Sequence, residues 1–251
     1  MKPIIFGLAG TILSEEERVF FQNHQPYGFI LFKRNCESRE QIIDLVNDLK
    51  TISTKIFIDQ EGGRVARIKP PIGNKLYPPA AEFGALVGTK GIEFAQDAVR
   101  ENYRELMSDL LELGINITCA PVVDVHFEGA HDVIGDRAFS NDPYIVSALS
   151  IATLEGLRAA GGDGVIKHIP GHGRSACDSH LDLPIVDAPL SELEATDFAA
   201  FEPLANIATY AMTAHIIYNA LDPHLPATLS KTVIDYIRNE IGFTGKLMTD
   251  D

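Results

Sequence analysis

Short apolar runs rich in Ile and Val alternate with longer helical patterns along this chain, and this alternation constrains the fold more than any other feature. The apolar runs predict strands at 4–7, 28–32, 55–59, 117–121, 164–168, 209–214 and 246–250. The segments between them predict helices at 14–24, 38–52, 94–113, 142–160, 190–207 and 230–241. Strands that alternate with helices indicate parallel βαβ units and an α/β fold.

Residues able to carry chemistry follow the predicted strands at their carboxyl ends, namely Asp59, Asp124, Lys167, His168, His215 and Asp250. Barrel enzymes place their sites at that edge, so we expect a TIM-type (β/α) barrel. An open doubly wound sheet is the alternative, but no Gly-x-Gly-x-x-Gly follows a strand to support a dinucleotide site.

The number of predicted strands bears on the completeness of the barrel. A closed TIM barrel has eight strands, and only seven are predicted here. We therefore expect 1–251 to be a single barrel domain that is incomplete at its C-terminal side and lacks the last helix–strand–helix unit. Such a sheet would expose two edges, which favours instability or association.

Composition narrows the classes of partner. The formal net charge of −14 argues against nucleic acid or an anionic membrane surface, because either would require a basic face. Cys36, Cys119 and Cys177 are widely spaced and form neither a disulfide framework nor a zinc pattern. No apolar stretch is long enough to span a membrane, and the N-terminal apolar run is too short for a signal peptide. We therefore expect a cytoplasmic protein without a nucleic-acid or membrane partner. We also expect a monomer, although composition does not determine the oligomeric state.

The segment 167–180 gathers one Lys, three His and one Asp in a stretch rich in Gly and Pro. Gly and Pro exclude a helix interior, so this segment is predicted to be a loop that presents chemistry after a strand. Asp178 and His180 point the same way in an extended loop, so Asp178 could hold one ring nitrogen of His180. Taken alone, such a pair is more often a surface hydrogen bond than a catalytic pair.

Five blocks occur in order along nearly the whole chain. The first block is Asp-Gln-Glu-Gly-Gly-Arg at 59–64, and the second joins Ala-Pro-Val-Val-Asp at 120–124 to Ile-Gly-Asp-Arg at 134–137. The third block is the segment 167–180. The fourth joins Met-Thr-Ala-His at 212–215 to Pro-Ala-Thr-Leu-Ser at 226–230, and the fifth joins Gly-Phe-Thr-Gly at 242–245 to Met-Thr-Asp-Asp at 248–251. With these blocks the chain resembles the family-three glycoside hydrolases, in the branch that removes N-acetyl-β-D-glucosamine. That family usually has Ser in place of Thr249, a change that keeps a hydroxyl.

The resemblance implies roles for individual residues. Asp250 would be the nucleophile of a retaining glycosidase, and His180 with Asp178 would form the acid/base dyad. The resemblance implies a sugar-binding set made of Asp59, Arg67, Arg137, Lys167 and His168. The implied substrates are N-acetylglucosaminyl-anhydromuramoyl fragments of peptidoglycan, a small-molecule sugar class, and no cofactor or metal is implied.

Two other interpretations stay open. His168, His172, His180 and Asp250 are ligand types that a metal-dependent barrel hydrolase would use, although no His-x-His ends the first predicted strand. A chain without its last unit is alternatively a non-catalytic remnant. Asp250 taken alone would be interpreted as the N-cap of a following helix.

Overall fold

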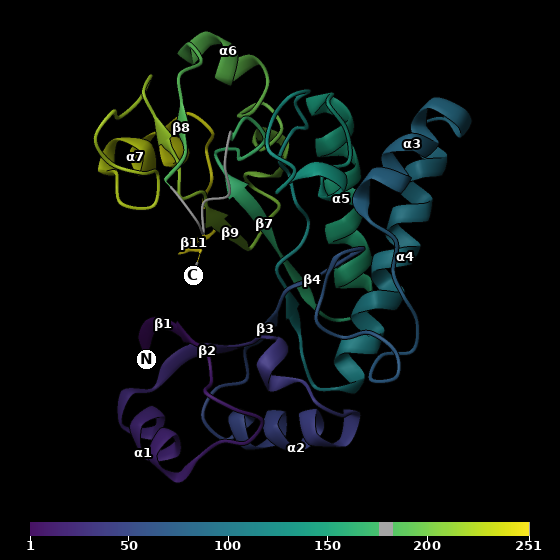
Figure 1. Ribbon diagram of the computed structural model, residues 1–251, viewed down its shortest axis with the longest axis vertical. Helices are drawn as coiled ribbons and strands as arrows, with labels where there is room; N and C mark the ends of the chain where they lie inside the picture. Colours follow the sequence, from purple (N-terminus) through teal and green to yellow (C-terminus); the bar gives the residue numbers. More distant parts are fainter. Residues whose placement is uncertain (176–182, 251) are drawn as a thin grey trace.

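The computed structural model describes residues 1–175 and 183–250, and a curled sheet of seven parallel strands runs through its centre (Figure 1). The strands follow one another in chain order across the sheet: β1 (Lys2–Phe6), β2 (Pro26–Leu31), β3 (Ile56–Ile58), β6 (Ile117–Thr118), β7 (Asp163–Ile169), β9 (Tyr210–Thr213) and β11 (Lys246–Thr249). Each of them overlaps one predicted run. The sheet order confirms the TIM-type (β/α) barrel and excludes the doubly wound alternative, whose strand order reverses.

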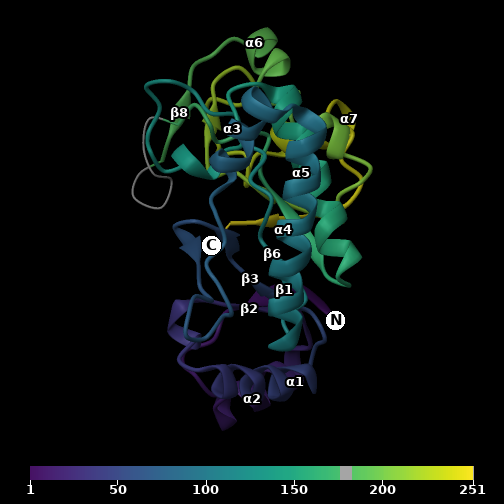
Figure 2. The ribbon, with the colours of Figure 1, turned by 90° about the vertical axis from the view of Figure 1, so that its right-hand side faces the viewer.

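Helices cover the outer side of this sheet (Figures 1 and 2). The helices of the described chain are α1 (Glu15–His24), α2 (Arg39–Lys50), α3 (Ala80–Lys90), α4 (Ile92–Glu112), α5 (Pro143–Ala159), α6 (Leu190–Ala195) and α7 (Lys231–Asn239). Of these, α3 packs on α4 and α5, outside the layer next to the sheet. Polar caps fix several helix starts, because Ser14, Ser38, Asp142 and Ser230 each accept a hydrogen bond from a first-turn backbone N–H. Within the part of the chain that the structure describes, no helix is long and apolar enough to cross a membrane.

The predicted helix at 190–207 is wrong in its length. The structure has the short helix α6 and, after a series of turns, the 3₁₀ helix η3 (Glu202–Leu204). Thr196 leaves the helical region with φ −128° and ψ −80°, and the buried carboxylate of Asp197 turns toward Arg174. Pro203 removes a further helical hydrogen bond, because it has no N–H.

Several short elements lie where the sequence predicts only loop. The hairpin β4 (Gln60–Gly62) and β5 (Val65–Ala66) follows β3, and α3 begins directly after Pro79. A second small sheet pairs β8 (Ile185–Val186) with β10 (Ile217–Tyr218). The 3₁₀ helices η1 (Lys33–Asn35) and η2 (Gly135–Arg137) complete the set.

Apolar side chains fill both faces of the sheet. One cluster lies on the inner face and contains Phe57, Ile117, Cys119, Val165, Tyr210 and Met212. A larger cluster packs the outer face against the helices. Burial on both faces explains why β3, β6 and β9 are continuous apolar runs without polar alternation, whereas the edge strands β1 and β11 are partly exposed.

The sheet stays open between its first and last strands. Within residues 1–175 and 183–250, β1 pairs only with β2 and β11 pairs only with β9. A cavity of about 760 Å³ lies between these edges, lined by residues of β1, β2, β9 and β11. The expected tendency of such edges to associate stays a prediction.

Candidate active site

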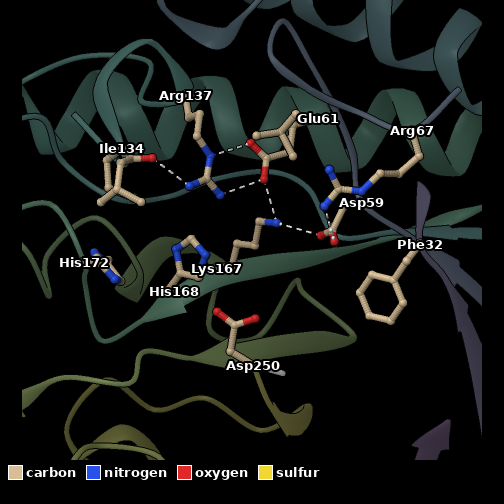
Figure 3. Close-up of a pocket in the computed structure, with 12 residues that line it drawn as sticks. Phe32, Asp59, Glu61, Arg67, Ile134, Arg137, Lys167, His168, His172 and Asp250 are labelled. Atoms are coloured by element: carbon tan, nitrogen blue, oxygen red, sulfur yellow. Dashed lines mark hydrogen bonds and ion pairs between the residues drawn. The ribbon is translucent and has the colours of Figure 1, made fainter. Parts of the chain in front are cut away.

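A polar cavity of about 360 Å³ lies at the carboxyl edge of the sheet (Figure 3). Its walls come from strand ends and the loops after them, and they consist of Phe32, Asp59, Glu61, Val65, Arg67, Val133, Ile134, Arg137, Lys167, His168, His172 and Asp250. All five predicted sugar-binding residues and Asp250 therefore meet in one cavity. Parallel strands end at a common edge, which explains how positions so far apart in the sequence come together.

The hairpin after β3 brings Arg67 back to Asp59. The side-chain carbonyl of Gln60 accepts hydrogen bonds from the backbone N–H groups of Arg67 and Ile68, at 2.8 and 3.0 Å. The Gln60 amide donates to the Ile68 carbonyl at 2.8 Å. The Arg67 guanidinium then lies 3.1 Å from the Asp59 carboxylate. A buried glutamine thus supports the geometry of this charged pair.

Lys167, from β7, bridges two carboxylates beneath the cavity (Figure 3). Its Nζ lies 3.1 Å from Asp59 Oδ1 and 2.6 Å from Glu61 Oε1, and the side chain is 3% exposed. Burial alone would lower the pKa of Lys167, but Glu61 and Asp59 raise it above its ordinary value. Burial raises the pKa of Asp59, but the Lys167 and Arg67 cations together lower it below its ordinary value. All three groups are therefore charged at neutral pH.

Arg137, the last residue of η2, meets Glu61 in a two-pronged ion pair. Its Nε and Nη2 each lie 2.8 Å from a Glu61 oxygen, while Nη1 donates to the Val133 carbonyl at 2.9 Å. Burial raises the pKa of Glu61, but Lys167 and then Arg137 lower it to about 2. Bidentate pairing of this kind fixes the plane of the guanidinium.

Asp124 lies behind His168 and is fully buried. Its Oδ2 is 2.6 Å from His168 Nδ1, and its Oδ1 accepts from the backbone N–H groups of His168 and His172 at 3.1 and 2.7 Å. Burial raises the pKa of Asp124, whereas His168 lowers it to about 2. The contact directs Nδ1 of His168 away from the cavity that the ring lines.

Asp250 follows β11 directly and enters the cavity from the side opposite Glu61. Thr249 pairs in register with Thr213 of β9, which fixes the end of β11. Figure 3 shows the Asp250 carboxylate pointing toward Lys167 and His168. A carboxylate there faces the space that a ligand held by those two side chains would occupy.

The predicted pair Asp178 and His180 lies outside the described residues. The chain just before that segment is anchored by Arg174, whose Nε lies 2.7 Å from Asp197 and whose guanidinium lies 3.8 Å from the centre of the Phe127 ring. The chain just after it enters the β8–β10 pair. The described residues therefore fix the positions at which the segment begins and ends.

Two residues of the site have no predicted role from the sequence, Glu61 and Asp124. Glu61 belongs to the same block as Asp59, and Asp124 follows a predicted strand. The sequence signal that could have found both is a carboxylate within a few residues of a predicted strand end. His215, which follows a predicted strand, is not among the lining residues, and its Nδ1 lies 2.8 Å from Thr228 Oγ1. Among residues 1–175 and 183–250, no three His, Cys, Asp or Glu side chains are grouped to hold a metal ion.

Known proteins resemble this chain over nearly its whole length. Residues 8–251 match the model of the glycosyl hydrolase family 3 N-terminal domain. A β-hexosaminidase from Alkalilimnicola ehrlichii is 41% identical over 256 residues, covering 99% of this chain and 72% of the relative. One from Stenotrophomonas maltophilia is 36% identical over 253 residues, covering 99% and 74%.

Solved structures agree with these relatives. NagZ from Neisseria gonorrhoeae, in complex with N-trifluoroacetyl-D-glucosamine, superimposes with a TM-score of 0.93 at 34% identity, covering 99% of this chain and 74% of that one. A family 3 β-N-acetylglucosaminidase from a Paenibacillus species gives a TM-score of 0.89 at 32% identity, covering 98% and 47%. Barrel sheet, charged cavity and relatives together define a glycoside hydrolase. The chain belongs to glycosyl hydrolase family 3.

Proposed function

We propose that this protein is a retaining exo-β-N-acetylglucosaminidase that removes terminal N-acetyl-β-D-glucosamine from peptidoglycan fragments of the N-acetylglucosaminyl-anhydromuramoyl type. It acts as a monomer in the cytoplasm, with 1–251 forming a single glycosidase domain. One observation carries the proposal, namely the convergence of Asp59, Lys167, Arg137, His168 and Asp250 on one cavity. Relatives named β-hexosaminidase, and a NagZ that binds an N-acylated glucosamine, support the choice of sugar.

The chemistry proceeds in two displacements. A carboxylate oxygen of Asp250 bonds to the anomeric carbon while the bond to the leaving oxygen breaks, and His180 gives that oxygen a proton. His180 then takes a proton from water, and the water oxygen displaces Asp250 from the anomeric carbon. Asp178 holds the His180 ring in one orientation and favours its charged form. Two inversions at one carbon give net retention.

Sugar binding uses the charged residues of the cavity. A sugar presents many hydroxyls, each of which can donate and accept a hydrogen bond, so the site needs both charged donors and charged acceptors. Asp59 accepts from hydroxyls, while Arg67, Arg137 and Lys167 donate. His168 contributes a ring edge whose orientation Asp124 fixes.

The direct test is hydrolysis of a chromogenic N-acetyl-β-D-glucosaminide by the purified chain, with the matching β-glucoside alongside. Turnover of the first substrate alone supports the proposal, and Asp250→Asn should then reduce kcat by on the order of 1,000-fold or more while the melting temperature stays close to that of the wild type. Turnover of neither substrate supports a non-catalytic remnant. Loss of turnover with a chelator would support the metal-dependent interpretation.

A further inference from the structure

Glu61 is the most heavily engaged carboxylate of the cavity. Its Oε1 accepts from Lys167 Nζ at 2.6 Å and from Arg137 Nη2 at 2.8 Å, and its Oε2 accepts from Arg137 Nε at 2.8 Å. A carboxylate has about four lone-pair sites, so three are already occupied. The side chain is only 7% exposed. Glu61 therefore has little capacity to bind a sugar hydroxyl itself. Its interactions are with the Lys167 ammonium and the Arg137 guanidinium.

The two cations need a shared anion to stay where they are. Arg137 lowers the pKa of Lys167 by like-charge repulsion, and Glu61 is the strongest of the groups that raise it. Without Glu61, Lys167 would keep Asp59 as its partner, and Arg137 would keep the Val133 carbonyl. The spacing between the two donors would then no longer be fixed by a common acceptor.

An outer helix holds Glu61 in place. The buried Tyr103 of α4 donates its hydroxyl to the backbone carbonyl of Glu61 at 2.9 Å. On the other side the chain turns at Gly62 with φ +107°, and a Cβ there would lie 2.4 Å from the Pro78 carbonyl oxygen. Tyr103 is not among the residues that line the cavity. Among the described residues, the hydrogen bond of its hydroxyl goes to Glu61, which connects α4 to the site.

We propose that Glu61 is a positioning residue that sets the spacing of Arg137 and Lys167 for sugar binding, and that Tyr103 of α4 holds Glu61 for this purpose. The inference rests on the proposed function of the cavity. It assigns a role in substrate affinity to a tyrosine on the outside of the barrel sheet.

The kinetic test compares four variants with the wild type on the chromogenic N-acetyl-β-D-glucosaminide. Glu61→Gln should raise KM about tenfold or more while kcat changes less than about threefold, because the lost interactions bind the sugar in the ground state and the transition state alike. Glu61→Asp keeps the charge but is one methylene shorter, so it should fall between Gln and the wild type. Tyr103→Phe should raise KM about threefold.

Tyr77→Phe is the matched control. The hydroxyl of Tyr77 donates to Asp109 of α4 at 2.6 Å, so the substitution removes a hydrogen bond from the same helix without touching Glu61. Its KM should equal that of the wild type. If Tyr103→Phe and Tyr77→Phe change KM equally, or if Glu61→Gln leaves KM unchanged, the inference is wrong.

A second measurement does not depend on turnover. Lys167 is 3% exposed and held by two carboxylates, so its ammonium protons should exchange slowly and give a ¹H–¹⁵N NMR signal, assigned by its absence from Lys167→Met. Glu61→Gln should shift or broaden this signal, because Lys167 then keeps Asp59 alone, and Tyr77→Phe should leave it unchanged. An unshifted and equally sharp signal in Glu61→Gln contradicts the inference. A wild type without turnover overturns the proposed function alone, since the ammonium signal still decides the role of Glu61.

Discussion

Asp124 shows how one buried carboxylate organises several residues of the site. Its two oxygens accept from the ring of His168 and from the backbone N–H groups of His168 and His172. Asp124 therefore orients the His168 side chain and also fixes the backbone between His168 and His172. Hydrogen bonds to a charged acceptor contribute about 1.5–3 kcal/mol each. The position of His168 in the cavity therefore depends on a residue that substrate does not reach.

Asp124→Asn should weaken both the fold and the site. The amide keeps the shape but accepts less strongly, so we expect the free energy of unfolding to fall by about 2 kcal/mol and kcat/KM to fall about tenfold. Urea denaturation and steady-state kinetics measure the two effects. Asp163→Asn is the control, because Asp163 lies at the opposite end of β7 and pairs with Arg158. It should lower stability without changing kcat/KM, and an equal loss of kcat/KM in both variants would contradict the role of Asp124.

At the scale of single residues, the sequence predicted which residues line the cavity better than it predicted the ion pairs and hydrogen bonds between them. Asp59, Lys167 and Asp250 could be predicted because each follows a strand and belongs to a recognisable block. Glu61 and Asp124 could not be assigned roles, because those roles depend on side chains that lie far away in the sequence. Spacing along the chain carries no information about which buried charges will pair across the sheet.

The crossing of α4 and α5 depends on a glycine. A Cβ at Gly156 would lie 2.2 Å from the Arg100 carbonyl oxygen, a backbone atom that cannot move alone. Gly156→Ala should therefore lower the free energy of unfolding by about 2 kcal/mol, since overpacking outweighs the helix propensity that alanine adds. Gly88→Ala on α3 meets nothing within 4 Å and should instead raise it by about 0.5–1 kcal/mol. Chemical denaturation measures the free energy of unfolding of both variants. A Gly156→Ala variant more stable than the wild type would show that α4 and α5 can move apart to accept the added methyl group.

At the scale of elements, strands were easier to predict than helix lengths. Strands buried on both faces form short apolar runs, which local sequence reveals. The helix predicted at 190–207 ends early because Asp197 pairs with Arg174, a contact that helical periodicity does not encode. The helix α3 was not predicted, because it directly follows the Pro-rich stretch 70–79, which is typical of a loop.

The stability of the whole molecule should fall as the pH is lowered from 6.5 to 4. Burial, and then the neighbouring His168, lower the pKa of His172 from 6.5 to about 4. The unfolded chain therefore binds a proton in this range that the folded protein does not, so stability is fully present above pH 6.5 and is lost toward pH 4. The loss is on the order of 3 kcal/mol. Unfolding free energies of His172→Phe measured across this range should vary less, and an unchanged slope would contradict this origin.

Further acidification acts through the buried carboxylates. The folded pKa values of Glu61 and Asp124 are both about 2, below their ordinary values of 4.5 and 3.8. The stability they contribute is present above those ordinary values and is lost as the pH falls toward 2. Glu61→Gln should therefore flatten the melting temperature between pH 4.5 and 2, and a curve parallel to that of the wild type would contradict the ion pairs described here.

The overall architecture was predictable because strand order equals chain order. Alternating strands and helices allow few other arrangements, and the position of polar residues after strands indicated the functional edge. The sequence predicts seven strands where a closed barrel has eight, and the sheet is accordingly open between β1 and β11. Cavity shape was not predictable, since it depends on the hairpin β4–β5 and on η2.

The most direct test of the two-step displacement is the configuration of the first sugar released. Proton NMR during the first minutes of hydrolysis of 4-nitrophenyl N-acetyl-β-D-glucosaminide distinguishes the anomers before they interconvert. Attack by Asp250 followed by attack of water predicts that β-N-acetylglucosamine appears first and that the α anomer grows in later. Release of the α anomer first would mean that water attacks directly, and would contradict a covalent intermediate on Asp250.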